Sequence, residues 1–228
     1  MNTPFEAKSF RERTVGDVAA ALPGATAVFR RHKLDFCCGG NVALEESARS
    51  RGADVAAIER ELTALTLASA RPTAPKETNA LIEHILTRYH EVHRRELPEL
   101  VKLARRVEAV HAEHAQAPHG LADTLQKMAG ELEVHMKKEE LILFPAMSRA
   151  ASGVLDTPIS QMRRDHDDHA VHLRRLESLT SGFALPEGAC RSWQALYAGT
   201  AKLVDDVMEH IHLENNALFP KFESRAAA

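Results

Sequence analysis

The chain has 228 residues, with 44% hydrophobic and 27% charged side chains and a formal net charge of −3 at pH 7. This composition fits a folded protein with one large domain or two smaller ones, and the mixed charge gives no nucleic-acid or membrane-surface signature. No apolar run approaches the length of about 18 residues that a transmembrane helix requires. Because the N-terminal residues also lack the apolar stretch of a secretory signal, we expect a cytoplasmic location.

Residues 1–70 are predicted to form a small helical domain. Thr14 followed by Asp17 resembles a capping box with the shorter Asp in place of Glu, and apolar residues at helical spacing continue to the break at Pro23. The glycines after the adjacent cysteines predict a loop. Further short helices are expected around Val28, over 42–50 and over 54–67, the last capped by Asp54.

A linker is predicted over residues 68–76, where prolines stand among small and polar residues. Long amphipathic segments follow within residues 77–228, and turn-forming residues separate them. Connections this short force neighbouring helices to run antiparallel, so the expected fold class is all-α, an up-down-up-down four-helix bundle preceded by the small helical domain. The four segments span about 78–115, 120–149, 158–180 and 187–224.

One sequence pattern occurs twice in the second part of the chain. His135 and Glu139 stand four residues apart and are followed by Leu-Phe-Pro. The same H-x3-E-x3-L-F-P text recurs 75 residues later, at His210 and Glu214. The bundle is therefore predicted to consist of two copies of one helical hairpin, each with a His/Glu pair on its second helix.

A second repeated pattern, H-x2-H, begins at His90 and again at His166, 76 residues apart. It places one histidine on the first helix of each hairpin, and 12 of the 13 histidines of the chain lie beyond residue 80. Two facing hairpins would bring four imidazoles and two carboxylates to one level of the bundle, which favours a site for two metal ions. The predicted metal ligands are His90, His135, Glu139, His166, His210 and Glu214.

The residue types of this set suit a metal centre. Side chains four residues apart on a helix lie on one face, with Cβ atoms about 5–6 Å apart, so each His/Glu pair can reach the same ion or two adjacent ions. Imidazole and carboxylate both bind iron or zinc, and a carboxylate can bridge two cations. Since buried histidine and glutamate are costly without partners, two copies at matched offset favour metal over a purely structural repeat.

Other residues near the pattern are expected to have different roles. His111 lies 21 residues after His90, about 30 Å along a helix, and is expected to be structural or exposed. His93 and His169 follow presumed ligands by three residues and are interpreted as non-ligands, although an outer or alternative ligand role stays open. Glu140 has no carboxylate counterpart in the second copy and is not assigned to the site.

The adjacent cysteines Cys37 and Cys38, followed by two glycines, are the second unusual feature of the sequence. Thiolates are favoured near cations, and the basic run from Arg30 to Lys33 stands just upstream. Two interpretations stay open: two small buried side chains in a helical domain, or a thiol pair that is redox-active or transfers metal. Cys190 stands alone at a predicted helix start and is expected to be a packing residue.

With these residues identified, the chain resembles the bacterial repair-of-iron-centres family, di-iron proteins of iron–sulfur cluster repair, over nearly its whole length. The resemblance rests on Asp-Phe-Cys-Cys-Gly-Gly ending at Gly40, on Arg-Tyr-His ending at His90, and on the two texts that begin at His135 and His210. Asp165 stands where relatives are expected to carry Glu, and it keeps the negative charge.

The resemblance implies a hemerythrin-like bundle with two non-haem iron ions at the six positions above, oxo-bridged and bridged by both glutamates. It implies damaged iron–sulfur proteins as partners after nitrosative or oxidative stress, with nitric oxide or oxygen as a small ligand, and leaves monomer or homodimer open. The expected role is non-enzymatic iron supply, with Cys37 and Cys38 as the candidate thiol or iron-transfer pair. Nitric oxide binding, scavenging or weak reduction is the alternative.

Two further readings of the same residues are less favoured. Oxygen storage or sensing fits poorly, because four histidines fall short of the five of simple hemerythrin oxygen carriers and because the N-terminal domain would be unexplained. A metal-free structural bundle would not explain why the His/Glu pattern occurs twice. Iron delivery and nitric oxide chemistry are not separated by the sequence, because both need the same site.

Overall fold

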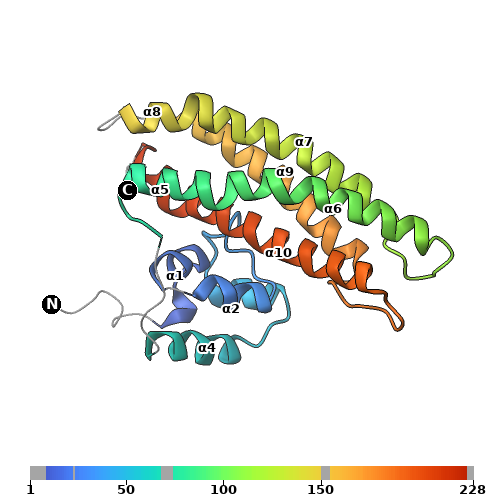
Figure 1. Cartoon of the computed structure of the whole chain (residues 1–228). Coiled ribbons are helices and arrows are strands. Elements are labelled where there is room, and N and C mark those ends of the chain that lie inside the picture. Colours follow the sequence, from blue (N-terminus) through green and yellow to red (C-terminus); the bar gives the residue numbers. More distant parts are fainter. Residues whose placement is uncertain (1–8, 23, 68–73, 150–154, 225–228) are drawn as a thin grey trace. The chain divides into compact units, whose positions relative to one another are not determined.

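The chain is described by a computed structural model, in which residues 9–22, 24–67, 74–149 and 155–224 are placed (Figure 1). Over this part of the chain the secondary structure is helical, apart from one isolated antiparallel bridge between Thr14 and Ala43. The predicted all-α class is confirmed. No helix among these residues is both long enough and apolar enough to span a bilayer.

The chain divides into two compact units by its internal contacts. The N-terminal unit comprises Met1–Lys76 and Met208–Lys221, and the bundle unit comprises Glu77–Val207 and Phe222–Ala228. The sequence-based domains, 1–70 and 77–228, are continuous segments, whereas the compact units group Met208–Lys221 with the N-terminal residues. The division into those two domains therefore stays a prediction.

Short capped helices build the N-terminal unit. The Thr14 hydroxyl accepts the backbone N–H of Asp17 at 3.1 Å, and the Asp54 carboxylate accepts that of Ala56 at 2.9 Å, so both predicted caps are present. Pro23, where the first helix was expected to break, lies outside the described residues. The helices are α1 (Val15–Ala21), α2 (Ala25–Arg31), α3 (Leu44–Ser50) and α4 (Val55–Leu67), preceded by a 3₁₀ turn, Phe10–Glu12.

The core of the N-terminal unit is apolar and includes a contribution from the late segment Met208–Lys221. Met208 packs against this core, and the carboxylate of Glu209 pairs with Arg30 at 3.2 Å. The ring of His212 lies edge-on to Phe36, with centroids 5.5 Å apart. The buried core side chains are Val15, Val18, Ala19, Leu22, Ala25, Val28, Phe29, Leu34, Phe36, Leu44, Ala48, Ile58 and Leu62.

Helices that lie side by side build the bundle unit, as Figure 1 shows. The predicted four-helix bundle is confirmed, with its first two helical segments interrupted by π turns. The first segment consists of α5 (Thr78–Ile85), the π turn η2 (Leu86–His90) and α6 (Glu91–Val110). The second consists of α7 (Leu121–Lys138), the π turn η3 (Glu139–Leu143) and α8 (Phe144–Arg149). The third is α9 (Asp156–Leu179), and the fourth is α10 (Arg191–Leu213), of which residues to Val207 belong to this unit.

The last predicted segment continues beyond α10 into the N-terminal unit, through the π turn η4 (Glu214–Leu218) and the 3₁₀ turn η5 (Phe219–Lys221). In η3 and η4 the N–H of the phenylalanine bonds the carbonyl of the glutamate five residues earlier. The proline that follows each phenylalanine has no N–H and its ring would clash with the carbonyl four residues earlier. That carbonyl belongs to Leu141 in η3 and to Asn216 in η4, so a wider turn there relieves the clash.

A partly buried ion pair joins η2 to α10 within the bundle unit. Arg88 donates to both oxygens of Asp206 at 2.7 and 3.2 Å, and Lys202 donates at 2.8 Å. Burial raises the pKa of Asp206, but the bonds from Arg88 and Lys202 outweigh it and hold that pKa below 3.8. Because the folded-state pKa is depressed, the pair stabilises the fold above the unfolded pKa and is lost as pH falls through the folded pKa.

Asp206→Asn is therefore expected to lower the free energy of unfolding of the metal-free chain by about 1–2 kcal/mol at pH 7. The deficit relative to the unsubstituted chain should shrink below about pH 4, because protonation then removes the same charge from Asp206. Urea denaturation at neutral and acidic pH measures both values. Asp167→Asn, which changes an exposed carboxylate on α9, is the matched control. An equal deficit at both pH values would contradict the assigned role of the Asp206 charge.

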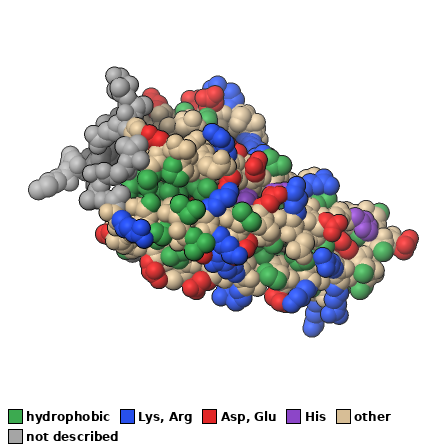
Figure 2. All heavy atoms as spheres, turned by 90° about the horizontal axis from the view of Figure 1, so that it is seen from above, with side chains coloured by type: hydrophobic (Ala, Val, Ile, Leu, Met, Phe, Trp, Pro, Cys, Tyr) green, Lys and Arg blue, Asp and Glu red, His purple; other side chains and the backbone are tan. Residues whose placement is uncertain are grey.

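The surface agrees with the charge balance of the sequence. Figure 2 shows acidic and basic side chains mixed over the face in view, with hydrophobic side chains between them. The hydrophobic residues that are most exposed on the described bundle include Leu141 at 74%, Val110 at 68% and Ile142 at 66%.

Candidate metal centre

Four predicted ligands of the bundle unit converge in its interior. His90 comes from η2, His135 from α7, Glu139 from η3 and His166 from α9, and none of them is more than 2% exposed. The Oε2 atom of Glu139 lies 3.4 Å from His135 Nε2 and 3.5 Å from His90 Nε2. The Nε2 atoms of His135 and His166 are 3.2 Å apart. The sequence prediction that these side chains come together is reproduced by the bundle.

The chemistry of this donor set fits a cation. The Nε2 atoms of His135 and His166 face each other at 3.2 Å, so at most one of them can carry a proton. At least one nitrogen lone pair therefore points into the gap. A carboxylate and several imidazoles without water around them carry a large cost unless a positive charge compensates them. Nitrogen and carboxylate oxygen donors together suit iron or zinc. We therefore infer that this interior cluster is built to hold metal.

The remaining predicted pair is also preorganised. His210 Nε2 lies 2.8 Å from Glu214 Oε1, both side chains are buried, and the two residues are one helical turn apart in the N-terminal unit. This repeats the spacing of His135 and Glu139. That all six residues surround one pair of ions stays a prediction.

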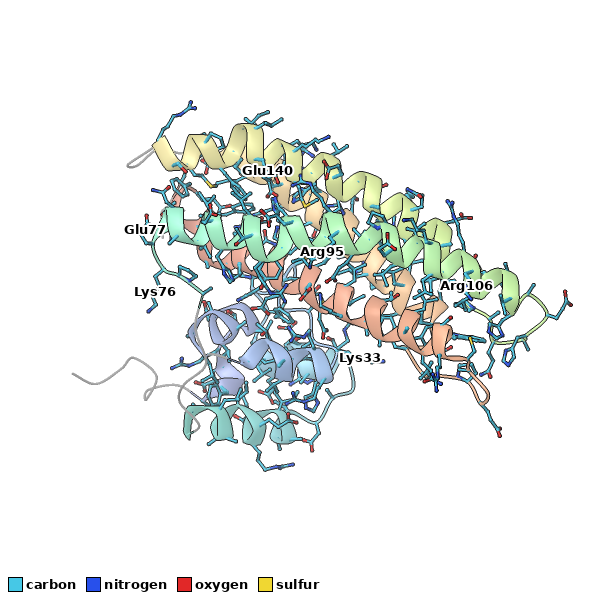
Figure 3. All side chains as sticks on the ribbon, viewed as in Figure 1. Lys33, Lys76, Glu77, Arg95, Arg106 and Glu140 are labelled. Carbon is cyan, nitrogen blue, oxygen red and sulfur yellow. The ribbon has the colours of Figure 1, made fainter. Side chains whose placement is uncertain are left out.

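Glu140, which the repeated pattern did not assign to the site, contacts a predicted ligand. Glu140 Oε1 lies 2.8 Å from His90 Nδ1, and Figure 3 labels this side chain on the helical segment that runs from α7 into η3. Arg94, one turn after His90, donates to both oxygens of Glu140 at 2.7 and 3.1 Å. Burial raises the pKa of Glu140, but the bonds from Arg94 and His90 prevail and lower it. The position of Arg94 four residues after His90 is the only sequence signal that points to this group.

Asp165 has the same relation to His135. Its Oδ2 atom lies 3.4 Å from His135 Nδ1 and accepts a bond from Lys138 at 2.7 Å. The hydrogen bond with His135, reinforced by Lys138 and Gln161, holds the pKa of Asp165 far below its usual range, although burial opposes the shift. The negative charge that Asp165 keeps in place of the expected Glu thus lies beside a predicted ligand.

These two carboxylates fix the chemistry of the imidazoles. A carboxylate that accepts a hydrogen bond from Nδ1–H selects the tautomer whose Nε2 carries a lone pair, and it raises the basicity of that nitrogen. The Nε2 atoms of His90 and His135 are the ones directed at Glu139. Glu140 and Asp165 therefore orient the imidazoles of His90 and His135, the two predicted ligands.

Three histidines interpreted as non-ligands have different surroundings in the bundle. His93 and His169 are buried, and the ring of His169 lies edge-on to His135 with centroids 5.1 Å apart. Their non-ligand role stays a prediction. His111 is half-buried, 3.1 Å from Cys190 Sγ, and its ring packs on a tryptophan at 4.8 Å. This agrees with the expected structural roles of His111 and Cys190.

An open groove of about 440 Å³ runs between α7 and α9. Its wall includes Asp165 and His169, both of which contact His135. Gly130 and Val134 of α7 line the opposite side, and Gly130 leaves space where a side chain would stand. The groove is thus lined by residues that contact His135, whereas His135 itself is buried.

The cysteine pair lies in the loop between α2 and α3, as predicted from the glycines. Cys37 is 4% exposed and Cys38 is half-buried. The side-chain contact with Cys38, together with burial and nearby Asp35, raises the pKa of the Cys37 thiol well above its usual value. The raised pKa favours the protonated thiol at Cys37, although cations stand just upstream in the sequence. The role of the cysteine pair stays a prediction.

The basic run upstream does not favour the Cys37 thiolate, because its side chains pair with carboxylates elsewhere in the N-terminal unit. Arg31 and His32 both bond the carboxylate of Glu61, and Arg30 bonds that of Glu209. These cations therefore contribute charge to ion pairs rather than to the thiols.

Comparison with known proteins agrees with this site. The profile of the Hemerythrin family, described as a hemerythrin HHE cation binding domain, matches residues 81–222, which include all six predicted ligands. The ScdA_N profile, described as a domain of unknown function (DUF542), matches residues 11–66.

Relatives match over almost the whole chain. A "Probable iron-sulfur cluster repair protein" of Haemophilus influenzae is 42% identical, and the match covers 93% of this chain and 97% of the relative. "Iron-sulfur cluster repair protein YtfE" of Musicola paradisiaca is 44% identical, with 93% and 96% covered, and its namesake from Pectobacterium atrosepticum is 41% identical, with 93% and 97% covered. The chain therefore belongs to the hemerythrin HHE family and, within it, to the iron–sulfur cluster repair proteins with an N-terminal ScdA_N domain.

Proposed function

We propose that this chain is a di-iron protein that repairs damaged iron–sulfur clusters by supplying iron. The names of the relatives favour cluster repair over the nitric oxide alternative. The observation that carries the proposal is the buried convergence of His90 and His135 on one oxygen of Glu139. Burying these groups together is costly in a bundle that holds no metal.

In this proposal the six predicted residues hold two iron ions, with Glu139 and Glu214 bridging them. The usual carboxylate di-iron bundle has four glutamates and two histidines. Here two carboxylates are exchanged for neutral imidazoles, so less positive charge is compensated. Ferrous iron should consequently be held less firmly and leave more easily on reduction. Bound iron supplies the ion that a damaged cluster lacks.

Cys37 and Cys38 are proposed as the pair that receives iron or engages the target. The loop that carries them is fixed by the turn that follows Glu214: the Asn215 amide donates to the Cys37 carbonyl at 3.0 Å, and the Asn216 amide donates to the Phe36 carbonyl at 3.3 Å. Within the N-terminal unit, the thiol loop is thus hydrogen-bonded to the residue next to a proposed iron ligand.

The proposed partners are iron–sulfur proteins whose clusters were damaged under nitrosative or oxidative stress, encountered in the cytoplasm. Recognition of a damaged cluster requires a surface that a folded iron–sulfur protein can approach. The half-buried Cys38 meets that requirement better than the buried ligands of the bundle.

The direct test loads the full chain with isotopically labelled iron, reduces it, and adds an iron–sulfur protein whose cluster has lost iron. Label is expected to enter the target together with recovery of its cluster spectrum, also when a strong ferrous chelator is present to trap released ions. The Cys37→Ala/Cys38→Ala variant should keep its iron and transfer it more slowly. Label that stays on the chain while the target remains unrepaired would overturn the proposal.

A further inference from the structure

Three potential ligand atoms meet in the loop between α2 and α3 of the N-terminal unit. Cys37 Sγ lies 3.8 Å from Cys38 Sγ and 3.3 Å from Asp35 Oδ1. Asp35, Cys37 and Cys38 offer donor atoms that all lie within 4.8 Å of one another. We propose that these three residues form a second metal site, which takes one divalent cation of the zinc or ferrous iron class through two thiolates and a carboxylate.

The spacing of the donors matches a tetrahedral ion. Thiolate sulfurs bound at about 2.3 Å to a tetrahedral centre lie about 3.8 Å apart, and a thiolate and a carboxylate oxygen at about 2.0 Å lie about 3.5 Å apart. The observed separations are 3.8 Å between the sulfurs and 3.3 Å between Cys37 Sγ and Asp35 Oδ1. A cation therefore fits between these atoms with little movement of the loop.

The surrounding residues hold the loop in this form. The backbone N–H of Cys38 donates to Asp35 Oδ1 at 2.9 Å, and the Asn215 amide donates to the Cys37 carbonyl at 3.0 Å. A Cβ atom on Gly39 would lie 3.1 Å from the Asp35 carbonyl oxygen, and one on Gly40 would lie 3.0 Å from that of Phe36. The two glycines thus favour a close approach of the loop to itself, with Asp35 beside the thiols.

The ligand count indicates exchange rather than permanent retention. Structural zinc sites have four protein ligands, whereas sites with three keep a position for an exchangeable group. Two soft thiolates and one carboxylate suit ferrous iron or zinc better than magnesium or calcium. Cation binding itself is independent of the proposed function, but the use of this site as a station for iron on its way to a target rests on that function.

The test uses the full chain with its bundle iron in place and cobalt(II) as the probe. One equivalent of cobalt is expected to produce a thiolate-to-metal charge-transfer absorption, which the histidine and glutamate ligands of the bundle cannot produce. Cys37→Ser/Cys38→Ser should abolish this absorption. Asp35→Asn keeps an oxygen to accept the Cys38 N–H, so the loop should persist while cobalt affinity falls by at least about tenfold.

Matched controls separate the site from general effects. Cys190→Ser removes the thiol of the bundle unit, and Asp17→Asn removes an exposed carboxylate of the N-terminal unit; both should leave the absorption and the affinity unchanged. The inference is overturned if the absorption is missing from the parent chain, survives loss of both cysteines, or is indifferent to Asp35→Asn. Iron analysis of the same samples tests the bundle separately: a chain that binds cobalt at the thiols but never retains bundle iron would refute the proposed function alone.

Discussion

Replacing Glu139 with alanine is expected to reduce the iron content of the purified protein from about two ions per chain to less than one. The Oε2 atom of this residue lies within 3.5 Å of both His90 Nε2 and His135 Nε2, so its loss removes the negative charge shared by these imidazoles. Elemental analysis and visible absorption measure the loss. Far-UV circular dichroism should show that the helices persist.

Glu99→Ala is the control for this change, because Glu99 lies on α6 with 70% of its side chain exposed and is bonded only to nearby Lys102 among the described residues. It should retain full iron. If Glu139→Ala also retained both ions, the proposed bridging position would be wrong. If it lost iron together with its helical signal, His135→Gln would provide the second measurement, since it keeps a polar side chain of similar size.

Glu140→Ala is expected to weaken iron binding by about 10- to 100-fold, because the partner that orients a metal-binding histidine is removed. This corresponds to about 1.4–2.7 kcal/mol of binding free energy. Competition with a ferrous chelator of known affinity measures the change. The histidine concerned is His90, whose Nδ1 atom lies 2.8 Å from Glu140 Oε1.

Glu133→Ala is a close control, because Glu133 also accepts a bond from Arg94, at 2.8 Å, and its other ion-pair partner is Lys137 rather than His90. Its affinity should equal that of the parent chain. Equal weakening in both variants would assign the effect to Arg94 and local charge instead of to the orientation of His90.

Local signals predicted the fold well. The side-chain caps at Thr14 and Asp54 are present, and the observed helices start and end within a few residues of the predicted segments. Helical periodicity and turn residues are local properties, so they are readable from the chain. The grouping of Met208–Lys221 with the N-terminal residues depends on contacts between distant segments and has no local signal.

The candidate site likewise combines residues that a local sequence pattern reveals with residues that only the structure reveals. The repeated text located His135 and Glu139, because identical spacing in two copies is visible in the sequence. Glu140 was missed for the same reason: its counterpart is Asn215, and the comparison of copies removed it. The two have diverged in role, since Glu140 bonds a histidine and Asn215 bonds the thiol loop.

The electrostatics of the thiol loop were beyond the sequence as well. Nearness along the chain suggested that Arg30 and Arg31 would act on the cysteines, yet their guanidinium groups bond Glu209 and Glu61. Charge acts through space, and the direction of a long side chain is set by tertiary packing. The raised pKa of Cys37 therefore required the structure.

The π turns constrain how this hairpin can evolve. Each adds one residue to a helix, so every later side chain is rotated by about 100° relative to an uninterrupted helix. In η3 that rotation leaves Leu141 and Ile142 outside while Phe144 and Met147 are 2% and 1% exposed. A regular helix of the same length would turn Phe144 and Met147 away from the core, so the wide turn sets which side chains are buried after Glu139. Both copies keep the same length between glutamate and proline, and each keeps its wide turn there.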